Sequence, residues 1–242
     1  MPSFGSTLKI GDILYSLLAI QRLGGGKLYL STKGPLTQSA YESLLPLLEY
    51  QEYLEDVVEW NGEKVDYDLT AASFRGEWQK YPLVQRYLYE FDVDTTVPDG
   101  PWIKTPAAIP SDVLVSVTNR YHGAKLNWES LVPDGAESAY IGIRPEWVWF
   151  CLFNHMRIPF IAPNDLLIAA QYIAGCNLFI GNETGNFAIA MALNKNCIVG
   201  LSPEGNSCFV PSKGNIQYFV DSGYYDATIT DSTDLYRWDL FT

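Results

Sequence analysis

The sequence predicts an α/β protein made of two small Rossmann-like domains, whose mainly parallel sheets face a central cleft. Short apolar runs alternate with helical segments along most of the chain, as in parallel sheets with helical crossovers. Four prolines interrupt this alternation between Asp94 and Pro110. With 242 residues, of which 48% are hydrophobic, the chain is long enough for two cores. We therefore expect an N-terminal domain over residues 1–105 and a C-terminal domain over residues 106–242.

The N-terminal half is expected to begin with a strand end or loop, followed by Gly11, Asp12 and a helix. The apolar residues of Leu8–Leu23 give this helix a broad buried face, and Gly24–Gly26 ends it. Pro46 lies within the second expected helix, Tyr41–Leu48, and is expected to shorten or kink it. The remaining elements are expected as a strand at Lys27–Ser31, a helix at Tyr41–Leu48, short strands at Val57–Trp60 and Val65–Leu69, and a helix at Trp78–Phe91.

The C-terminal half repeats the alternation of strands and helices. Asp165–Gly175 is the best-formed helix, with Asn164 or Asp165 near its cap and Gly175 closing it. The tyrosine-rich end, Ser222–Thr242, is expected to be irregular and to pack back across the first half. The other elements are expected as strands at Asp112–Thr118, Ala139–Gly142 and Pro159–Ala162, a short helical or loop segment at Trp128–Val132, and a helix at Glu146–His155.

The segment Cys176–Gly200 is the most informative part of the chain, because it predicts a complete βαβ unit. The apolar run Leu178–Ile180 stops at a polar turn, an alanine-rich helix follows at Phe187–Leu193, and a second apolar run begins at Cys197. The turn therefore presents its side chains where the helix N-terminus points. Backbone N–H groups and the positive end of the helix dipole favour phosphate at such a point.

The turn itself reads Asn182-Glu183-Thr184-Gly185-Asn186. A carboxylate repels phosphate, so Glu183 is better suited to accepting hydrogen bonds from sugar hydroxyls beside it. Phosphate together with ribose hydroxyls indicates a nucleotide or a nucleotide-sugar. The alternative is an ordinary strand-to-helix turn capped by Asn186 or Thr184.

Two further segments carry candidate site residues at carboxyl ends of predicted strands, where open parallel sheets bind ligands. Asp12 is a candidate general base toward an acceptor hydroxyl, with a helix N-cap as the alternative. Arg120 and Lys125 could neutralise a leaving diphosphate, and a solvated loop is the alternative for this segment. His122 lies between them and either orients a hydroxyl or packs.

Composition narrows the function classes. The net charge of −12 argues against a broad basic surface that binds nucleic acid non-specifically. The four cysteines show no C-x-x-C spacing, which indicates free thiols in a reducing compartment. The N-terminus lacks the pattern of a secretory signal. We therefore expect a cytoplasmic protein without a transmembrane segment. No metal-ligand cluster, Walker loop or dinucleotide fingerprint is present in the sequence. We expect neither a metal nor a cofactor.

Three segments resemble the GT-B glycosyltransferases, especially family 9, the heptosyltransferase-like proteins. In Leu8–Leu23, Gly-Asp precedes an apolar helix. The segment Asn119–Leu131 is similar to the family's basic segment, in which Arg or Lys precedes Trp and an acidic residue. Asp165–Gly200 is similar to its signature of a leucine-rich helix, an IGN-[D/E]-[ST]-G turn and an alanine-rich helix. The three lie in the family's order and span both halves of the chain.

The resemblance implies a hexosyl- or heptosyltransferase-like enzyme with two Rossmann-like domains. Our first hypothesis is that this enzyme is inverting and metal-independent. By position, Asp12 after Gly11 corresponds to the family's catalytic base. Arg120 and Lys125 correspond to its diphosphate-contacting basic residues. The turn Asn182–Asn186 would hold the phosphates and sugar hydroxyls of a nucleotide-sugar donor, bound mainly by the second domain.

Two alternatives share this architecture. The first is a nucleotide- or sugar-binding module that lost the chemistry, and Phe187, which replaces a histidine common in the family, favours it. The second is a nucleotide-sugar epimerase. The acceptor stays open among a glycan, a lipid-linked sugar, a small metabolite and a modified nucleic-acid base.

Overall fold

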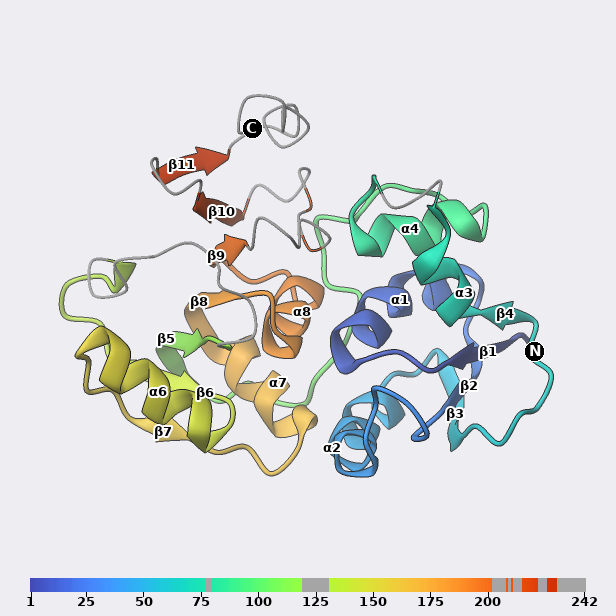
Figure 1. Ribbon diagram of the computed structural model, residues 1–242, viewed down its shortest axis with the longest axis horizontal. Helices are drawn as coiled ribbons and strands as arrows, with labels where there is room; N and C mark the ends of the chain where they lie inside the picture. The colour runs from blue at the N-terminus through green and yellow to red at the C-terminus, as the bar shows by residue number, and fades with distance from the viewer. Residues whose placement is uncertain are drawn as a thin grey trace.

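The computed structural model describes residues 1–76, 80–118, 131–201, 208, 210, 215–221 and 226–229. Within these residues the chain forms two sheets that lie side by side, each packed against helices (Figure 1). The predicted α/β class with two mainly parallel sheets is confirmed.

The first sheet has the order β3-β2-β1-β4, and all its neighbouring strands are parallel. Its strands and their helices are β1 (Ser3–Ser6), α1 (Ile10–Arg22), β2 (Gly26–Leu30), α2 (Gln38–Glu49), β3 (Leu54–Glu59), β4 (Tyr67–Asp68), α3 (Leu69–Phe74) and α4 (Leu83–Glu90).

The second sheet has the order β11-β10-β9-β8-β5-β6-β7 and is parallel except for the antiparallel edge strand β11. Its strands and their helices are β5 (Ser111–Ser116), β6 (Ser138–Ile141), α6 (Arg144–Asn154), β7 (Phe160–Ile161), α7 (Leu166–Gly175), β8 (Cys176–Asn182), α8 (Gly185–Ala192), β9 (Cys197–Leu201), β10 (Ile216–Asp221) and β11 (Asp226–Ile229).

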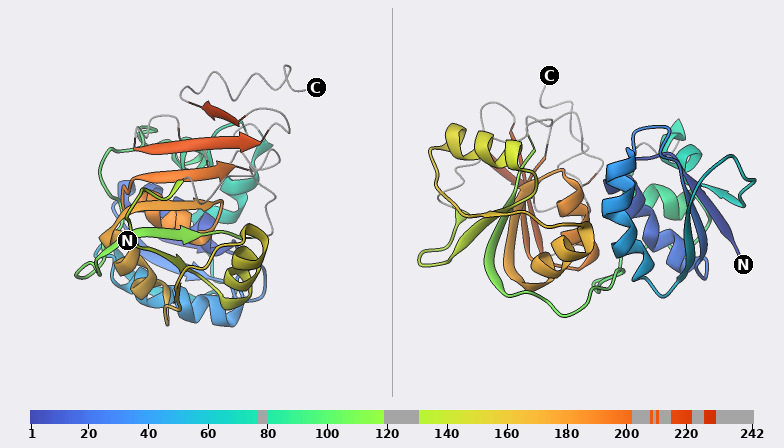
Figure 2. Two further views of the ribbon diagram at one scale, coloured as in Figure 1. Left: turned by 90° about the vertical axis from the view of Figure 1, so that its left-hand side faces the viewer. Right: turned by 90° about the horizontal axis from the view of Figure 1, so that it is seen from below.

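Helices fill the space between the two sheets. Helix α1 packs on α8 and helix α2 on α7, while α6 covers the opposite face of the second sheet (Figure 2). One continuous hydrophobic core joins these layers, and a smaller core lies between the second sheet and α6. Trp102 lies between the two sheets and is 1% exposed; its backbone N–H donates to the Ala192 carbonyl at 2.9 Å, and its indole N–H to the Leu14 carbonyl at 3.4 Å. The proline-containing segment between Asp94 and Pro110, near which the domain boundary was expected, is thus part of the packing between the halves.

Helix α2 corrects the expectation that Pro46 shortens the second helix. The helix continues to Glu49 with Pro46 inside it. A proline in a helix interior costs about 3 kcal/mol. Leu44, Leu47 and Leu48 are fully buried on the same helix, and each buried leucine contributes about 1.5–3 kcal/mol. The buried face therefore outweighs the missing hydrogen bond.

Two other expectations in the first half were wrong. The predicted strand Val65–Leu69 is reduced to two residues, because Asp68 caps α3 by accepting a hydrogen bond from the Ala71 N–H at 2.9 Å. The predicted helix Trp78–Phe91 begins only at Leu83 and ends at Glu90, because proline at position 82 disfavours helical backbone in the residue before it. Residues 77–79 lie outside the described part.

The C-terminal end is not wholly irregular. Strand β11 lies within the expected irregular segment Ser222–Thr242, and the rest of that segment lies outside the described residues. Most of Trp128–Val132 also lies outside them. The four cysteines are free, as expected. Among the described helices, none combines the length and the apolar character of a membrane span.

Candidate functional site

The turn between β8 and α8 is a capped helix start at the carboxyl edge of the second sheet. Thr184 is the N-cap of α8, and its hydroxyl oxygen accepts a hydrogen bond from the Phe187 N–H at 3.1 Å. This is the ordinary capped turn that the sequence allowed as an alternative. The N–H groups of Gly185 and Asn186 stand in the first turn, where no intrahelical carbonyl can accept from them. A helix start of this kind favours an anion.

Asn182 ties this turn to the end of β5. Its side-chain oxygen accepts from the Thr118 N–H at 2.9 Å, and its amide nitrogen donates to the Thr118 carbonyl at 2.8 Å. The Thr118 hydroxyl in turn donates to the Glu146 carboxylate in the first turn of α6, at 2.6 Å. The three residues therefore join the ends of two strands to the start of a helix.

Asn186 makes similar contacts one turn further on. Its amide nitrogen donates to the Ser116 hydroxyl at 3.0 Å and to the Ile141 carbonyl at 3.3 Å. The side chain of Asn186 therefore contacts the ends of β5 and β6. The backbone N–H of Asn186 is the group that could donate a hydrogen bond to an anion.

Glu183 lies between the two halves of the molecule. It is 7% exposed and interacts with the Tyr15 phenol of α1. Burial is the main cause that raises the pKa of Tyr15 well above its ordinary value, and the neighbouring Cys208, Tyr218 and Glu183 raise it further. A buried carboxylate beside a neutral phenol is suited to accepting hydrogen bonds.

Asp12 lies inside α1, which corrects the expectation that it stands between the first strand and the helix. Helix α1 begins at Ile10, with Lys9 as N-cap, so Asp12 is the third helical residue. It accepts a backbone hydrogen bond from Lys9, as the acidic residue of a capping box does. Burial raises the pKa of its carboxyl above 3.8, and the hydrogen bond from Lys9 and the charges of Lys9 and Arg86 oppose this shift.

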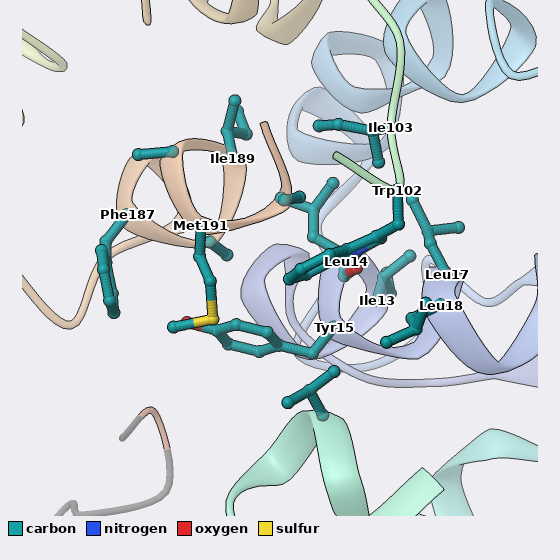
Figure 3. Close-up of a cluster of buried hydrophobic side chains, with 14 of the residues drawn as sticks. Ile13, Leu14, Tyr15, Leu17, Leu18, Trp102, Ile103, Phe187, Ile189 and Met191 are labelled. Carbon is teal, nitrogen blue, oxygen red and sulfur yellow. Dashed lines mark hydrogen bonds between the residues drawn. The ribbon is translucent and has the colours of Figure 1, made fainter. Parts of the chain in front are cut away.

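The start of α1 lies directly against the start of α8. A Cβ added to Gly185 would be 3.2 Å from the Ile10 Cγ2, so only a residue without a side chain leaves Ile10 undisturbed there. Further along the two helices, Tyr15 and Met191 point toward one another (Figure 3). The first turn of α1, to which Asp12 belongs, and the start of α8 thus meet at one junction, although Asp12 and Asn182 are 170 positions apart in the sequence.

The predicted residues Arg120, His122 and Lys125 lie outside the described residues. Thr118, which precedes that segment, is described, and its hydrogen bonds join it to Asn182 and Glu146. The described residues hold no group of three or more histidine, cysteine or acidic side chains arranged for a metal ion.

Sequence reasoning missed Tyr15, Arg86 and Glu146, which the fold brings to this region. Tyr15 and Arg86 belong to amphipathic helices, where an aromatic or basic side chain carries no signal of its own. Glu146 could have been noticed as an acidic residue at the start of a helix that follows a strand.

No family model matches the sequence, and no curated protein matches it either. Solved structures do. E. coli heptosyltransferase WaaC with ADP matches with a TM-score of 0.64 at 11% identity, over 89% of this chain and 92% of that chain. A glycosyl transferase family 9 protein from Veillonella parvula DSM 2008 matches with a TM-score of 0.61 at 10% identity, over 99% and 96%. The fold is GT-B.

A third GT-B structure agrees with these two. E. coli ADP-heptose lps heptosyltransferase II matches with a TM-score of 0.61 at 12% identity, over 90% of each chain. In structure the chain resembles glycosyltransferase family 9, as its motifs indicated. Within this GT-B fold, the start of α1 meets the start of α8, and the described residues of the predicted site lie on or beside these two helix ends.

Proposed function

We propose that the chain is a glycosyltransferase that moves a sugar from a nucleotide-sugar donor to an acceptor hydroxyl, with inversion and without a metal. What supports the proposal is the contact between Ile10 in the first turn of α1, the helix that carries Asp12, and Gly185 at the anion-favouring start of α8. The structural neighbours are named as glycosyltransferases, and one of them was solved with ADP.

Each group has a role in this reaction. The first N–H groups of α8 and the side chains of Arg120 and Lys125 would hold the donor diphosphate. Glu183 would accept hydrogen bonds from sugar hydroxyls. Asp12 would take the proton of the acceptor hydroxyl while the acceptor oxygen bonds to the sugar carbon. The bond from that carbon to the diphosphate breaks, and the nucleoside diphosphate leaves with the electron pair.

We also propose that the two halves divide the work, with residues 1–105 on the acceptor side and residues 106–242 on the donor side. Asp12 belongs to the first half and Glu183 to the second. The donor diphosphate would lie against α8, and the acceptor would enter beside α1. The acceptor class is left open by the described residues.

Replacing Asp12 by asparagine tests the proposal. Loss of a general base lowers turnover by about 10²–10⁴-fold. Donor affinity, measured by calorimetry with the nucleotide-sugar that a thermal-shift screen selects, should change little. The matched control is Asp56→Asn, a half-exposed aspartate of β3 that pairs with Lys27 at 2.9 Å and should leave turnover unchanged. Undiminished transfer by the Asp12 variant would exclude the role of Asp12.

A binding module without chemistry is the second candidate, and Phe187 favours it. In place of the histidine that the resemblance leads one to expect, Phe187 is fully buried. Its ring stacks with Phe179 at 6.5 Å and meets Tyr218 edge-on at 6.4 Å, so the side chain belongs to the core. Such a module would release heat on binding a nucleotide-sugar without forming product. An epimerase would convert the donor without an acceptor.

A further inference from the structure

Helix α6 has an exposed apolar face. Its inner face packs on the second sheet through Trp147 and Phe150, and Phe150 is fully buried. On the opposite side of the helix, Leu152 and Phe153 are 72% and 68% exposed, and Val148 is 41% exposed. The helix lies on the side of the molecule away from the first sheet (Figure 1). A helix that is apolar all round is normally buried all round, so the exposed side of α6 calls for a partner.

The exposed apolar side chains form one continuous strip along α6. Val148, Trp149, Leu152 and Phe153 are spaced so that they share one face of the helix, which we call the outer face of α6. The rings of Trp149 and Phe153 stack there, with their centroids 5.1 Å apart and their planes inclined by 14°. Among the described residues, seven large apolar side chains are exposed, and four of them belong to α6 or, as Ile143, directly precede it. Apolar side chains gathered in this way mark an interaction surface.

The chain turns away from the outer face where α6 ends. His155 has a positive φ of 54° and terminates the helix. The carbonyl of Ile158 then accepts a hydrogen bond at 2.9 Å from the indole N–H of Trp147, which belongs to the inner face. The exposed Arg157 lies in this returning segment. The outer face therefore ends at Phe153.

The charges at the two ends of α6 fit a second, antiparallel copy of the same helix. Arg144 is exposed at the first position of α6, and its guanidinium carbon lies 5.9 Å from the centre of the Trp147 ring. It stands at the positive end of its own helix dipole, which is unfavourable for a cation. The last turn, which ends at Asn154, carries no basic residue, so the negative end of the dipole is not compensated.

A two-fold axis across the middle of α6 brings these ends together. In such a pair Arg144 of each copy lies at the C-terminal end of the other copy's helix, where a cation is favourable. A parallel pair would instead bring the two Arg144 side chains together. A lipid surface fits less well, because helices that bind anionic lipids carry several Lys or Arg residues, whereas Arg144 is the only basic residue of α6.

We propose that the outer face of α6 is the contact surface of a homodimer, in which the α6 helices of two copies pack antiparallel about a two-fold axis. Both copies offer the same face, as a two-fold contact requires. One helix from each copy makes a small interface, so we expect a dissociation constant in the micromolar range and a monomer in dilute solution. The face lies away from the junction of α1 and α8, so the inference does not depend on the proposed glycosyl transfer (Figure 1).

Sedimentation equilibrium of the full chain, from low micromolar to several hundred micromolar concentration, tests the proposal. The mass of the wild type should rise from that of a monomer to that of a dimer. Leu152→Glu places a charge in the apolar contact and should raise the dissociation constant by about tenfold or more. The matched control is Phe74→Glu, at a side chain of α3 that is 67% exposed, and it should leave the dissociation constant unchanged. Circular dichroism confirms that each variant is folded.

A charge exchange tests the antiparallel arrangement. Arg144→Glu places a carboxylate at the negative helix end of the other copy and should weaken the dimer severalfold. Adding Asn154→Lys supplies a cation at that end, so the double variant should recover most of the affinity. Failure of the double variant to recover affinity would overturn the antiparallel dimer.

Two further results would overturn the proposal. The first is a wild type that stays monomeric at every concentration, and the second is a dimer that Leu152→Glu leaves intact. Should Leu152→Glu fail to fold, Leu152→Ser is measured against the same criteria. The monomeric wild type is then sedimented with vesicles of phosphatidylcholine and phosphatidylglycerol. Binding that the variant loses would assign the outer face of α6 to a lipid surface in place of a second copy.

Discussion

Replacing Asn182 by alanine is expected to loosen the edge of the second sheet at which the candidate site lies. Asn182 is 4% exposed, and both ends of its amide bond the main chain of Thr118, at 2.9 and 2.8 Å. Each such bond contributes about 1 kcal/mol, and leaving the buried Thr118 groups unpaired adds a desolvation penalty of similar size. We therefore expect a loss of about 2–4 kcal/mol in the free energy of unfolding.

Urea denaturation followed by tryptophan fluorescence and circular dichroism measures this loss, and the melting temperature should fall by roughly 4–16 °C. The matched control is Asn177→Ala, an exposed asparagine on the same strand whose amide donates to Asp112 at 3.2 Å. This surface change should cost less than about 0.5 kcal/mol. An Asn182→Ala variant as stable as that control would refute the view that Asn182 holds the ends of β5 and β8 together.

Three further predictions follow from the same structure. Trp102→Ala should lower the free energy of unfolding by about 3–5 kcal/mol, and both halves should still unfold in one transition. The control Phe153→Ala, at a side chain that is 68% exposed, should change the free energy of unfolding little. Two separate transitions in the wild type would contradict a core that the two halves share. Thr184→Ala should cost about 1 kcal/mol and Thr184→Ser should recover most of it, since the hydroxyl caps α8. Because burial raises the pKa of Asp12 in the folded state, the stability that its protonated form contributes is lost as pH rises through that pKa. Asp12→Asn should therefore gain on the wild type in melting temperature as pH rises toward neutrality, and an equal difference at all pH values would contradict the burial of this carboxyl.

The βαβ unit could be predicted because its signals are local. The apolar run of β8, the threonine that caps α8 and the alanines that follow all act on neighbouring residues, and the structure places these elements as expected. The boundary of α7 was predictable for the same reason, since Asp165 caps it by accepting from the Ile168 N–H at 2.9 Å.

The remaining features depend on contacts between residues far apart in the sequence. Asn182 was expected to contact substrate, but its amide bonds Thr118, which lies 64 residues earlier. Nothing near α4 in the sequence indicates that this helix packs on α1. The expectation that Pro46 shortens the second helix considered only the local cost of a proline in a helix. It left out the leucines that α2 buries against the rest of the core.

The central claim is that Asp12 and the start of α8 border one binding site for a nucleotide-sugar. The most direct measurement is an NMR titration of the full chain, labelled with ¹⁵N, with a panel of nucleoside diphosphate sugars. We predict that the sugar bound most tightly shifts the amide signals of Glu183, Gly185 and Asn186 together with that of Asp12. Shifts confined to another face of the molecule, or shifts at α8 with Asp12 unaffected, would contradict the claim.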